Sequence, residues 1–305
     1  MDPNTSFTVQ TADGVALFVD RFDSPQAPHR SGSNGHQDHA PEKILLIVHG
    51  YSEHGGRYRH VPGFLGEDFS RFYAMDLRGH GRSGGIRGHA PSFDAFVDDL
   101  QRVTKAIEER ERGNRLFLLA HSLGGLIALT LLLREKKVPF EFAVISAPLL
   151  ELVMPVNPLL KGVARLLNST LSTLQLSGDL NPQRLSHDTA VVENYIKDRL
   201  VHAKVTPRMF FAMEEGMAWA RKQTGPLACP LLMLAAGDDM IVSTPSIREF
   251  YENLKCRDKE LREYPGMFHE VMNEIGKAKV FADIREWMRP RLEAAPRTPA
   301  PEAGT

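Results

Sequence analysis

A strand, a tight turn around a serine and a helix follow one another between residues 116 and 133, and this unit constrains the fold more than any other stretch. The run Leu116–Ala120 is short and bulky, which is typical of a buried strand, whereas Leu123–Leu133 is longer and rich in leucine, which is typical of a buried helix. Ser122 lies in the turn between small residues, Ala120 and Gly124, that let strand and helix pass close together. The pattern is typical of a nucleophile elbow, usually written G-x-S-x-G, with a methyl added at its first glycine. A glycine-rich turn without a function is the alternative for these five residues alone, and the strand–turn–helix context favours the elbow.

Further apolar segments alternate with helical patterns along the rest of the chain. An Asp-Gly turn joins two strands near the N-terminus into a hairpin. Alternating strands and helices predict an α/β fold with a doubly wound, mostly parallel sheet. The predicted strands are Phe7–Thr11, Val15–Asp20, Lys43–Val48, Arg71–Met75, Glu141–Ser146, Cys229–Ala236 and Lys259–Tyr264, and the predicted helices include one from Ser92 to about Arg112 and one from Lys277 to Arg289.

The alternation breaks between residues 148 and 226, where helical stretches follow one another without an obvious strand; they are Leu149–Leu176, Asp188–Leu200 and Pro207–Lys222. We therefore expect one α/β core formed by residues 1–147 and 227–289, with residues 148–226 inserted as a helical cap. Met209, Met213 and Met217 recur at helical spacing within it. Residues 24–42 and 290–305 are rich in Pro and in small or polar residues, which predicts a flexible loop and a disordered tail.

Composition excludes several classes of function. A net charge of −1 gives no general attraction to nucleic acid. The N-terminus lacks the pattern of a signal peptide, no apolar run is long enough for a membrane span, and two cysteines make no disulfide framework, so we expect a cytoplasmic protein. The histidines of residues 24–42 show no metal-ligand spacing, and the glycines of residues 76–85 match no phosphate-binding pattern, so neither a metal nor a cofactor is expected. Nothing in the sequence sets an oligomeric state.

The polar clusters of the chain all follow predicted strands. Ligands of such sheets bind beyond the carboxyl ends of the strands, so these clusters are expected to converge there. They are His49-Gly50-Tyr51, Asp76, Ser122, Asp239 and His269.

Ser122 needs a base to take its proton and an acid to orient that base. In this kind of fold the order along the chain is serine, acid, histidine, and His269 is the only histidine beyond the last predicted acid. Either Asp238 or Asp239 can be the acid, since both follow the same strand and composition does not choose between them.

A tetrahedral intermediate also needs two hydrogen-bond donors. One is the backbone N–H after the serine, that of Leu123. The other is expected from the turn after an earlier strand, where the Tyr51 N–H is the candidate. His49 is a weak candidate for the base because it precedes the serine in the chain.

The sequence resembles the monoacylglycerol lipase family of serine α/β-hydrolases from about Phe7 to Trp287. The matching segments are His49–Tyr58 (H-G-x-x-E-H-x-x-R-Y), Asp76–Ser83 (D-x-R-G-H-G-x-S), Ala120–Gly125, Asp239–Val242 (D-x-I-V) and Tyr264–Glu270. The resemblance implies the α/β-hydrolase fold, favours Asp239 over Asp238, and implies cleavage of single-chain acyl glycerols by Ser122, Asp239 and His269 without a cofactor.

Three alternatives are weighed. A lysophospholipase or a general short-chain carboxylesterase would use the same residues, and a non-catalytic ligand receptor would have no need of all three. The cap is more apolar than its own packing requires, which suits a single acyl chain and a transient contact with a lipid surface.

Overall fold

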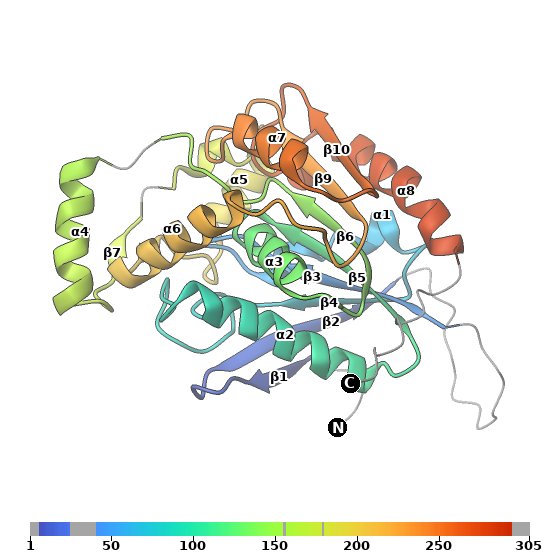
Figure 1. Ribbon diagram of the computed structural model, residues 1–305, viewed down its shortest axis with the longest axis horizontal. Helices are drawn as coiled ribbons and strands as arrows, with labels where there is room; N and C mark the ends of the chain where they lie inside the picture. The colour runs from blue at the N-terminus through green and yellow to red at the C-terminus, as the bar shows by residue number, and fades with distance from the viewer. Residues whose placement is uncertain (1–5, 25–40, 155–156, 179, 295–305) are drawn as a thin grey trace.

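The computed structural model describes residues 6–24, 41–154, 157–178 and 180–294, and it is built on one eight-stranded sheet (Figure 1). The strand order is β1-β2-β4-β3-β5-β6-β9-β10. The hairpin strands β1 and β2 run antiparallel, β2 also pairs antiparallel with β4, and all other neighbours are parallel. The bounds are β1 Phe7–Gln10, β2 Ala16–Asp23, β3 Lys43–Val48, β4 Arg71–Met75, β5 Arg115–His121, β6 Phe140–Ser146, β9 Leu231–Ala236 and β10 Lys259–Tyr264. The predicted doubly wound, mostly parallel sheet is confirmed.

Helices cover both faces of this sheet. One face carries α2 (Phe93–Arg110), α3 (Ser122–Arg134) and α7 (Thr244–Asn253), whose apolar residues share one core with the sheet. The other face carries α1 (Pro62–Leu65) and α8 (Lys277–Glu293), together with the short 3-10 helices η1 (Gly55–Tyr58) and η3 (Val271–Asn273). Ser92 begins α2 as predicted, its side chain accepting a hydrogen bond from the Ala95 N–H.

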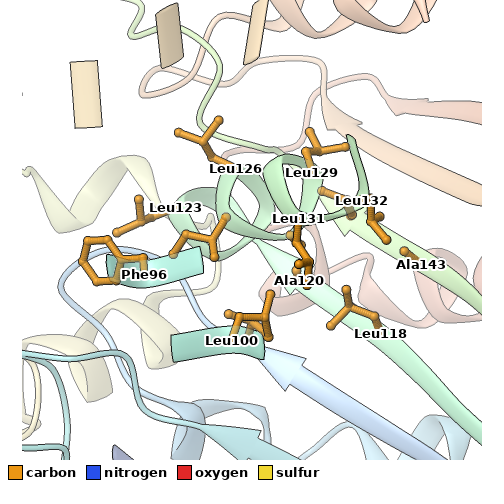
Figure 2. Packing of buried hydrophobic residues seen from close by; sticks show 14 of the residues in the cluster. Phe96, Leu100, Leu118, Ala120, Leu123, Leu126, Leu129, Leu131, Leu132 and Ala143 are labelled. Carbon is orange, nitrogen blue, oxygen red and sulfur yellow. The ribbon is translucent and has the colours of Figure 1, made fainter. Parts of the chain in front are cut away.

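The helix α3 is buried along nearly its whole length, which fixes the turn from which it starts. Figure 2 shows that Leu123 and Leu131 point toward α2 and β5, whereas Leu126 and Leu129 point from the opposite side of the helix. Phe96 and Leu100 of α2 face Leu123 across this interface, and Leu118 of β5 lies beneath. Since cores pack at crystal-like density, α3 cannot shift without displacing these neighbours.

The segment from Pro148 to Pro226, called the cap below, connects β6 to β9. It contains α4 (Pro158–Thr170), η2 (Pro182–Arg184), α5 (Thr189–Lys197) and α6 (Pro207–Arg221). It also contains two short paired strands that the sequence did not predict, β7 (Leu176–Ser177) and β8 (Lys204–Val205). Among the described residues of the predicted helical stretch from Leu149 to Leu176, only α4 is helical, and it lies at the edge of the molecule (Figure 1).

The C-terminal end of the chain differs from expectation. The tail was expected to begin at Pro290, but α8 continues through it to Glu293. A proline in the last turn removes a single helical hydrogen bond. Arg115 stabilises the end of the helix by donating to the carbonyls of Arg291 and Leu292, and the Leu292 side chain is buried. The rest of the predicted tail and nearly all of the predicted 24–42 loop lie outside the described residues. Across the described ranges, no helix combines the length and the apolarity that crossing a bilayer demands.

Candidate active site

Four loops meet at the carboxyl edge of the parallel strands, and each carries one part of the candidate site. The turn after β5 carries Ser122, the loop after β9 carries Asp239, and the loop after β10 carries His269. The loop after β3, beginning at His49, closes the fourth side. This edge of an α/β sheet is where ligands bind.

Ser122, His269 and Asp239 are joined by two hydrogen bonds. The Ser122 Oγ is 3.0 Å from His269 Nε2, and His269 Nδ1 is 2.7 Å from Asp239 Oδ2. The other Asp239 oxygen accepts hydrogen bonds from the backbone N–H groups of Ile241 and Val242, at 2.8 and 2.9 Å. Asp238 is exposed, and the hydrogen bond of His269 Nδ1 goes to Asp239, so the structure joins Asp239 rather than Asp238 to His269.

The charges in this arrangement support one another. Burial alone would raise the pKa of Asp239, but the neighbouring imidazole and the two N–H groups hold it below its usual value. Burial alone would lower the pKa of His269, but the Asp239 carboxylate raises it above the ordinary value of 6.5. A carboxylate that stabilises the imidazolium is what a histidine needs to accept a proton from a serine.

The turn at Ser122 is strained, as a nucleophile elbow requires. Its φ is +52°, a left-handed conformation that is rare for a residue with a side chain. Gly124 is essential to the close packing, because a Cβ there would lie 2.4 Å from the His49 carbonyl oxygen. Only two other non-glycine residues of the described chain have positive φ, Ser52 at +65° and Ala147 at +42°. Ser52 and Ser122 line the site, where backbone strain commonly gathers, and Ala147 directly follows β6.

The two predicted donors lie on either side of Ser122. The Leu123 N–H is in the first turn of α3, where such groups have no partner inside the helix and the helix dipole favours negative charge. The Tyr51 N–H lies in the β3 loop, and neither group donates to another described residue. Gly50 brings this loop against the serine, since a Cβ at Gly50 would lie 3.0 Å from the Ser122 Cβ. His49 is excluded as the base because its Nδ1 bonds the Gly50 carbonyl and its Nε2 accepts from the Leu77 N–H.

A buried network of charges under the site was not predicted. Arg57 donates to Glu53 and makes two hydrogen bonds of 2.7 Å to Glu270, the residue after His269. The second oxygen of Glu53 accepts from the Gly50 N–H at 2.6 Å and from the Tyr58 hydroxyl. Burial alone would raise the pKa of Glu270, but Arg57 lowers it to about 2. Glu53 and Arg57 belong to the H-G-x-x-E-H-x-x-R-Y segment quoted above. Their hydrogen bonds to Gly50 and Glu270 are visible only in the folded structure, so the sequence alone did not indicate this network.

A cavity of about 430 Å³ opens over Ser122, within the range of small-molecule sites. Its outer wall is apolar and comes mostly from the cap: Leu149, Leu152, Met154, Leu160, Leu180, Leu185, Val205, Phe210, Met213 and Met217. Its base is polar and includes Glu53, His121 and Glu270. The predicted methionine stripe divides: Met213 and Met217 line the cavity, whereas Met209 is fully buried in the core.

The chain is similar to known hydrolases over most of its length. A profile of the family described as serine aminopeptidase, S33, matches residues 39–276. The chain is 31% identical over 254 residues to a monoacylglycerol lipase of Mycolicibacterium smegmatis, an alignment that covers 82% of this chain and 89% of the relative. It is 32% identical over 260 residues to an uncharacterized abhydrolase domain-containing protein of Dictyostelium discoideum, spanning 84% of this chain but 27% of that much longer relative.

Among solved structures, a monoacylglycerol lipase of Paleococcus ferrophilus superposes with a TM-score of 0.76 at 27% identity. The superposition covers 90% of this chain and 99% of the other. The fold is therefore that of the α/β-hydrolases.

Proposed function

The chain belongs to the serine aminopeptidase S33 family of hydrolases, and we propose that it cleaves the ester bond of monoacylglycerols to a free fatty acid and glycerol. The observation that carries this proposal is the chain of two hydrogen bonds from Ser122 through His269 to Asp239, set at the base of an apolar cavity. The core would be residues 1–147 and 227–289, and the cap of 148–226 would cover the site.

The proposed roles follow from the geometry. The Ser122 Oγ attacks the ester carbonyl while His269 Nε2 takes its proton, and Asp239 stabilises the imidazolium. The backbone N–H groups of Tyr51 and Leu123 hold the negative oxygen of the tetrahedral intermediate. His269 then protonates the departing glycerol oxygen and leaves an acyl-enzyme on Ser122. A water molecule, deprotonated by the same imidazole, releases the fatty acid and restores the serine.

The cavity supports a substrate with one acyl chain. Each methylene that leaves water contributes about 0.8 kcal/mol, so one chain along the apolar wall supplies much of the binding free energy. Methionine side chains such as Met213 and Met240 adapt to chains of different shape. A second or third acyl chain would have to remain outside the cavity.

The polar base of the cavity supports an uncharged alcohol. His121 is buried beside the His269 ring, its Nδ1 has no hydrogen-bond partner in the described structure, and burial lowers its pKa to about 3. A neutral imidazole without a partner suits a hydroxyl group. The ammonium group of a peptide would need a carboxylate, and Glu53 and Glu270 are both bound to Arg57, so the site favours esters over aminopeptidase substrates.

The proposal is tested on the full chain with a panel of monoacyl, diacyl and triacyl glycerols, a lysophospholipid and a butyrate ester. We expect monoacylglycerols to be hydrolysed with the highest kcat/KM. Ser122→Ala should lower kcat by at least about 10³-fold with an unchanged circular dichroism spectrum, and it should no longer react with a fluorophosphonate. Near-normal turnover by folded Ser122→Ala would refute the nucleophile. Preference for the lysophospholipid would establish the alternative substrate. A folded protein that neither reacts with the fluorophosphonate nor hydrolyses any ester would favour a non-catalytic receptor.

We further propose that this enzyme is cytoplasmic and that α4 touches the lipid surface from which the substrate is drawn. Leu159, Val163 and Leu166 of α4 are 78, 50 and 66% exposed, and the only charged side chains of the helix are the cations Lys161 and Arg165. An exposed apolar stripe with basic flanks is typical of helices that lie in a membrane interface.

Vesicle binding tests this contact. Leu159→Gln combined with Leu166→Gln should reduce sedimentation with phosphatidylglycerol vesicles while leaving butyrate hydrolysis unchanged. Ile275→Gln is the matched control, because Ile275 is 72% exposed but lies outside the cap. Equal sedimentation of the double variant and the unchanged protein would exclude α4 as the contact.

A further inference from the structure

The Tyr51 side chain connects the turn that carries the proposed oxyanion donor to the cap. Its hydroxyl donates a hydrogen bond of 2.5 Å to the carbonyl oxygen of Lys204, 153 residues along the chain. The next residue of the turn is also bonded to the cap, since the Ser52 carbonyl accepts from the His202 N–H at 3.3 Å. Two successive residues of the turn are therefore fastened to one short cap segment.

The Tyr51 ring packs against two histidine rings, one from the core and one from the cap. It meets the core residue His80 edge-on at 5.4 Å and the cap residue His202 edge-on at 6.0 Å. The two histidine rings are themselves 4.6 Å apart. Burial raises the pKa of the Tyr51 phenol, so its hydroxyl keeps the proton that it donates.

The turn needs an external support because part of it is strained. Gly50 is held by the core, through the hydrogen bond of its N–H to Glu53. Ser52 has a left-handed backbone with φ of +65°, which the turn would not keep without surrounding contacts. Tyr51 lies between the two, so the direction of its N–H depends on both attachments.

The cap segment that receives Tyr51 is itself fixed to the core. The Thr206 N–H donates to the Gly88 carbonyl at 3.0 Å, and the Thr206 hydroxyl is bonded to His89. Gly88 lies so close to Lys204 that a Cβ at Gly88 would be 1.9 Å from the Lys204 carbonyl oxygen. By contrast α4 projects at the edge of the molecule and packs on α6 (Figure 1), so movement of α4 need not disturb this attachment.

We propose that Tyr51 is a positioning residue whose phenol, anchored on Lys204, aims the Tyr51 backbone N–H at the oxyanion. This inference rests on the proposed ester hydrolysis. It implies that residues 202–206 of the cap are part of the catalytic apparatus, and that only the remainder of the cap is free to open for substrate.

Tyr51→Phe tests the proposal, because it removes one hydrogen bond and keeps the ring. Complete loss of an oxyanion donor costs about 10²- to 10³-fold in kcat, so a donor that is only misdirected should cost about 10-fold. On a butyrate ester, which leaves most of the cavity empty, we expect kcat to fall about 10-fold with KM within twofold. Affinity for a trifluoromethyl ketone, which forms a tetrahedral adduct, should fall by the same factor, whereas affinity for a long-chain alkyl glycerol ether should not change.

Asp198→Ala is the matched control. It removes another bond between the cap and the same loop, the 2.9 Å hydrogen bond of His54 Nε2 to the Asp198 carboxylate, and does not touch Tyr51 or Ser52. We expect kcat of this variant to stay within twofold of the unchanged protein. An unchanged kcat in Tyr51→Phe, a loss in KM alone, or equal losses in the two variants would overturn the proposal. Failure of the hydrolase function itself would be seen separately, as the absence of ester turnover by the unchanged protein.

Discussion

Ser122 Oγ and His269 Nε2 lie 3.0 Å apart, although 147 residues separate them along the chain. The serine leaves β5 and the histidine follows β10, with β6 and β9 between them in the sheet. The hydrogen bond therefore depends on the register of four parallel strands. Asp239, which leaves β9, enters the same arrangement from between the two.

Replacing the acid distinguishes its two sequence candidates. We expect Asp239→Asn to lower kcat by about 10³- to 10⁴-fold, because an amide cannot stabilise the imidazolium and favours the wrong tautomer of His269. Asp238→Asn should stay within twofold, since Asp238 is exposed. Initial rates on one monoacylglycerol and the melting temperatures of both variants test this expectation. A large loss of kcat in Asp238→Asn, with little loss in Asp239→Asn, would assign the acid to Asp238 instead.

The rate of hydrolysis should depend on the protonation of His269. Only the neutral imidazole accepts the serine proton, and its pKa is raised by Asp239, so kcat/KM should fall as the pH drops, with a midpoint above 6.5. In Asp239→Asn the supporting charge is gone, and the midpoint of the remaining activity should move to lower pH. Rates on a soluble butyrate ester between pH 5 and 9 measure both midpoints. A midpoint that stays in place would mean that another group limits the rate.

A polar substitution in the cavity should separate long from short substrates. Met213→Gln is expected to lower kcat/KM for a long-chain monoacylglycerol at least about 10-fold more than for a butyrate ester, because only the long chain reaches the apolar wall. Met213→Leu keeps the wall apolar at similar volume. It should change kcat/KM by no more than twofold for either substrate. Equal losses on both substrates would mean that Met213 serves only to pack the cap.

Replacing glycine by alanine should have opposite effects on stability at two positions, Gly124 and Gly162. Gly124→Ala would place a Cβ 2.4 Å from the His49 carbonyl oxygen and should force α3 away from β3, with a lower melting temperature and little activity. Gly162→Ala lies within α4, where a Cβ meets nothing within 4 Å, and should stabilise the helix by up to about 1 kcal/mol. Thermal unfolding of the two variants side by side measures the difference. A tolerated Gly124→Ala would contradict the close approach of the elbow to the β3 loop.

Local patterns were sufficient to predict most of the core. Short apolar runs that end at polar residues mark the strands that begin at Lys43 and Arg71 and the strand before Ser122. Such patterns extend over only a few residues, so they can be recognised without knowledge of the fold. The order of elements then brought Ser122, Asp239 and His269 to one edge. The choice between Asp238 and Asp239 needed the structure or a resemblance, because neighbouring side chains carry the same local signal.

The cap was harder to predict because its structure depends on what it touches. The pairing of β7 with β8 joins residues about thirty positions apart in strands of two residues each, too short for a periodic pattern. The spacing of the three methionines of α6 predicted that they lie on one helical face. In the structure Gly216 allows α6 to pack closely against Phe93. Met209 is therefore buried in the core, whereas Met213 and Met217 line the cavity. The charges of Glu53, Arg57 and Glu270 came together only through folding.

The left-handed backbones of Ser52, Ser122 and Ala147 have a consequence for how the chain evolves. Glycine adopts such conformations without strain, whereas other residues there cost of the order of 1 kcal/mol or more each. Selection for stability alone would therefore favour glycine at all three positions. A lineage that no longer needed the activity would be free to accept those changes, and it would gain heat resistance as it lost the hydroxyl of Ser122. A serine kept at position 122 despite this strain is thus what the proposed activity requires and what stability alone would not select.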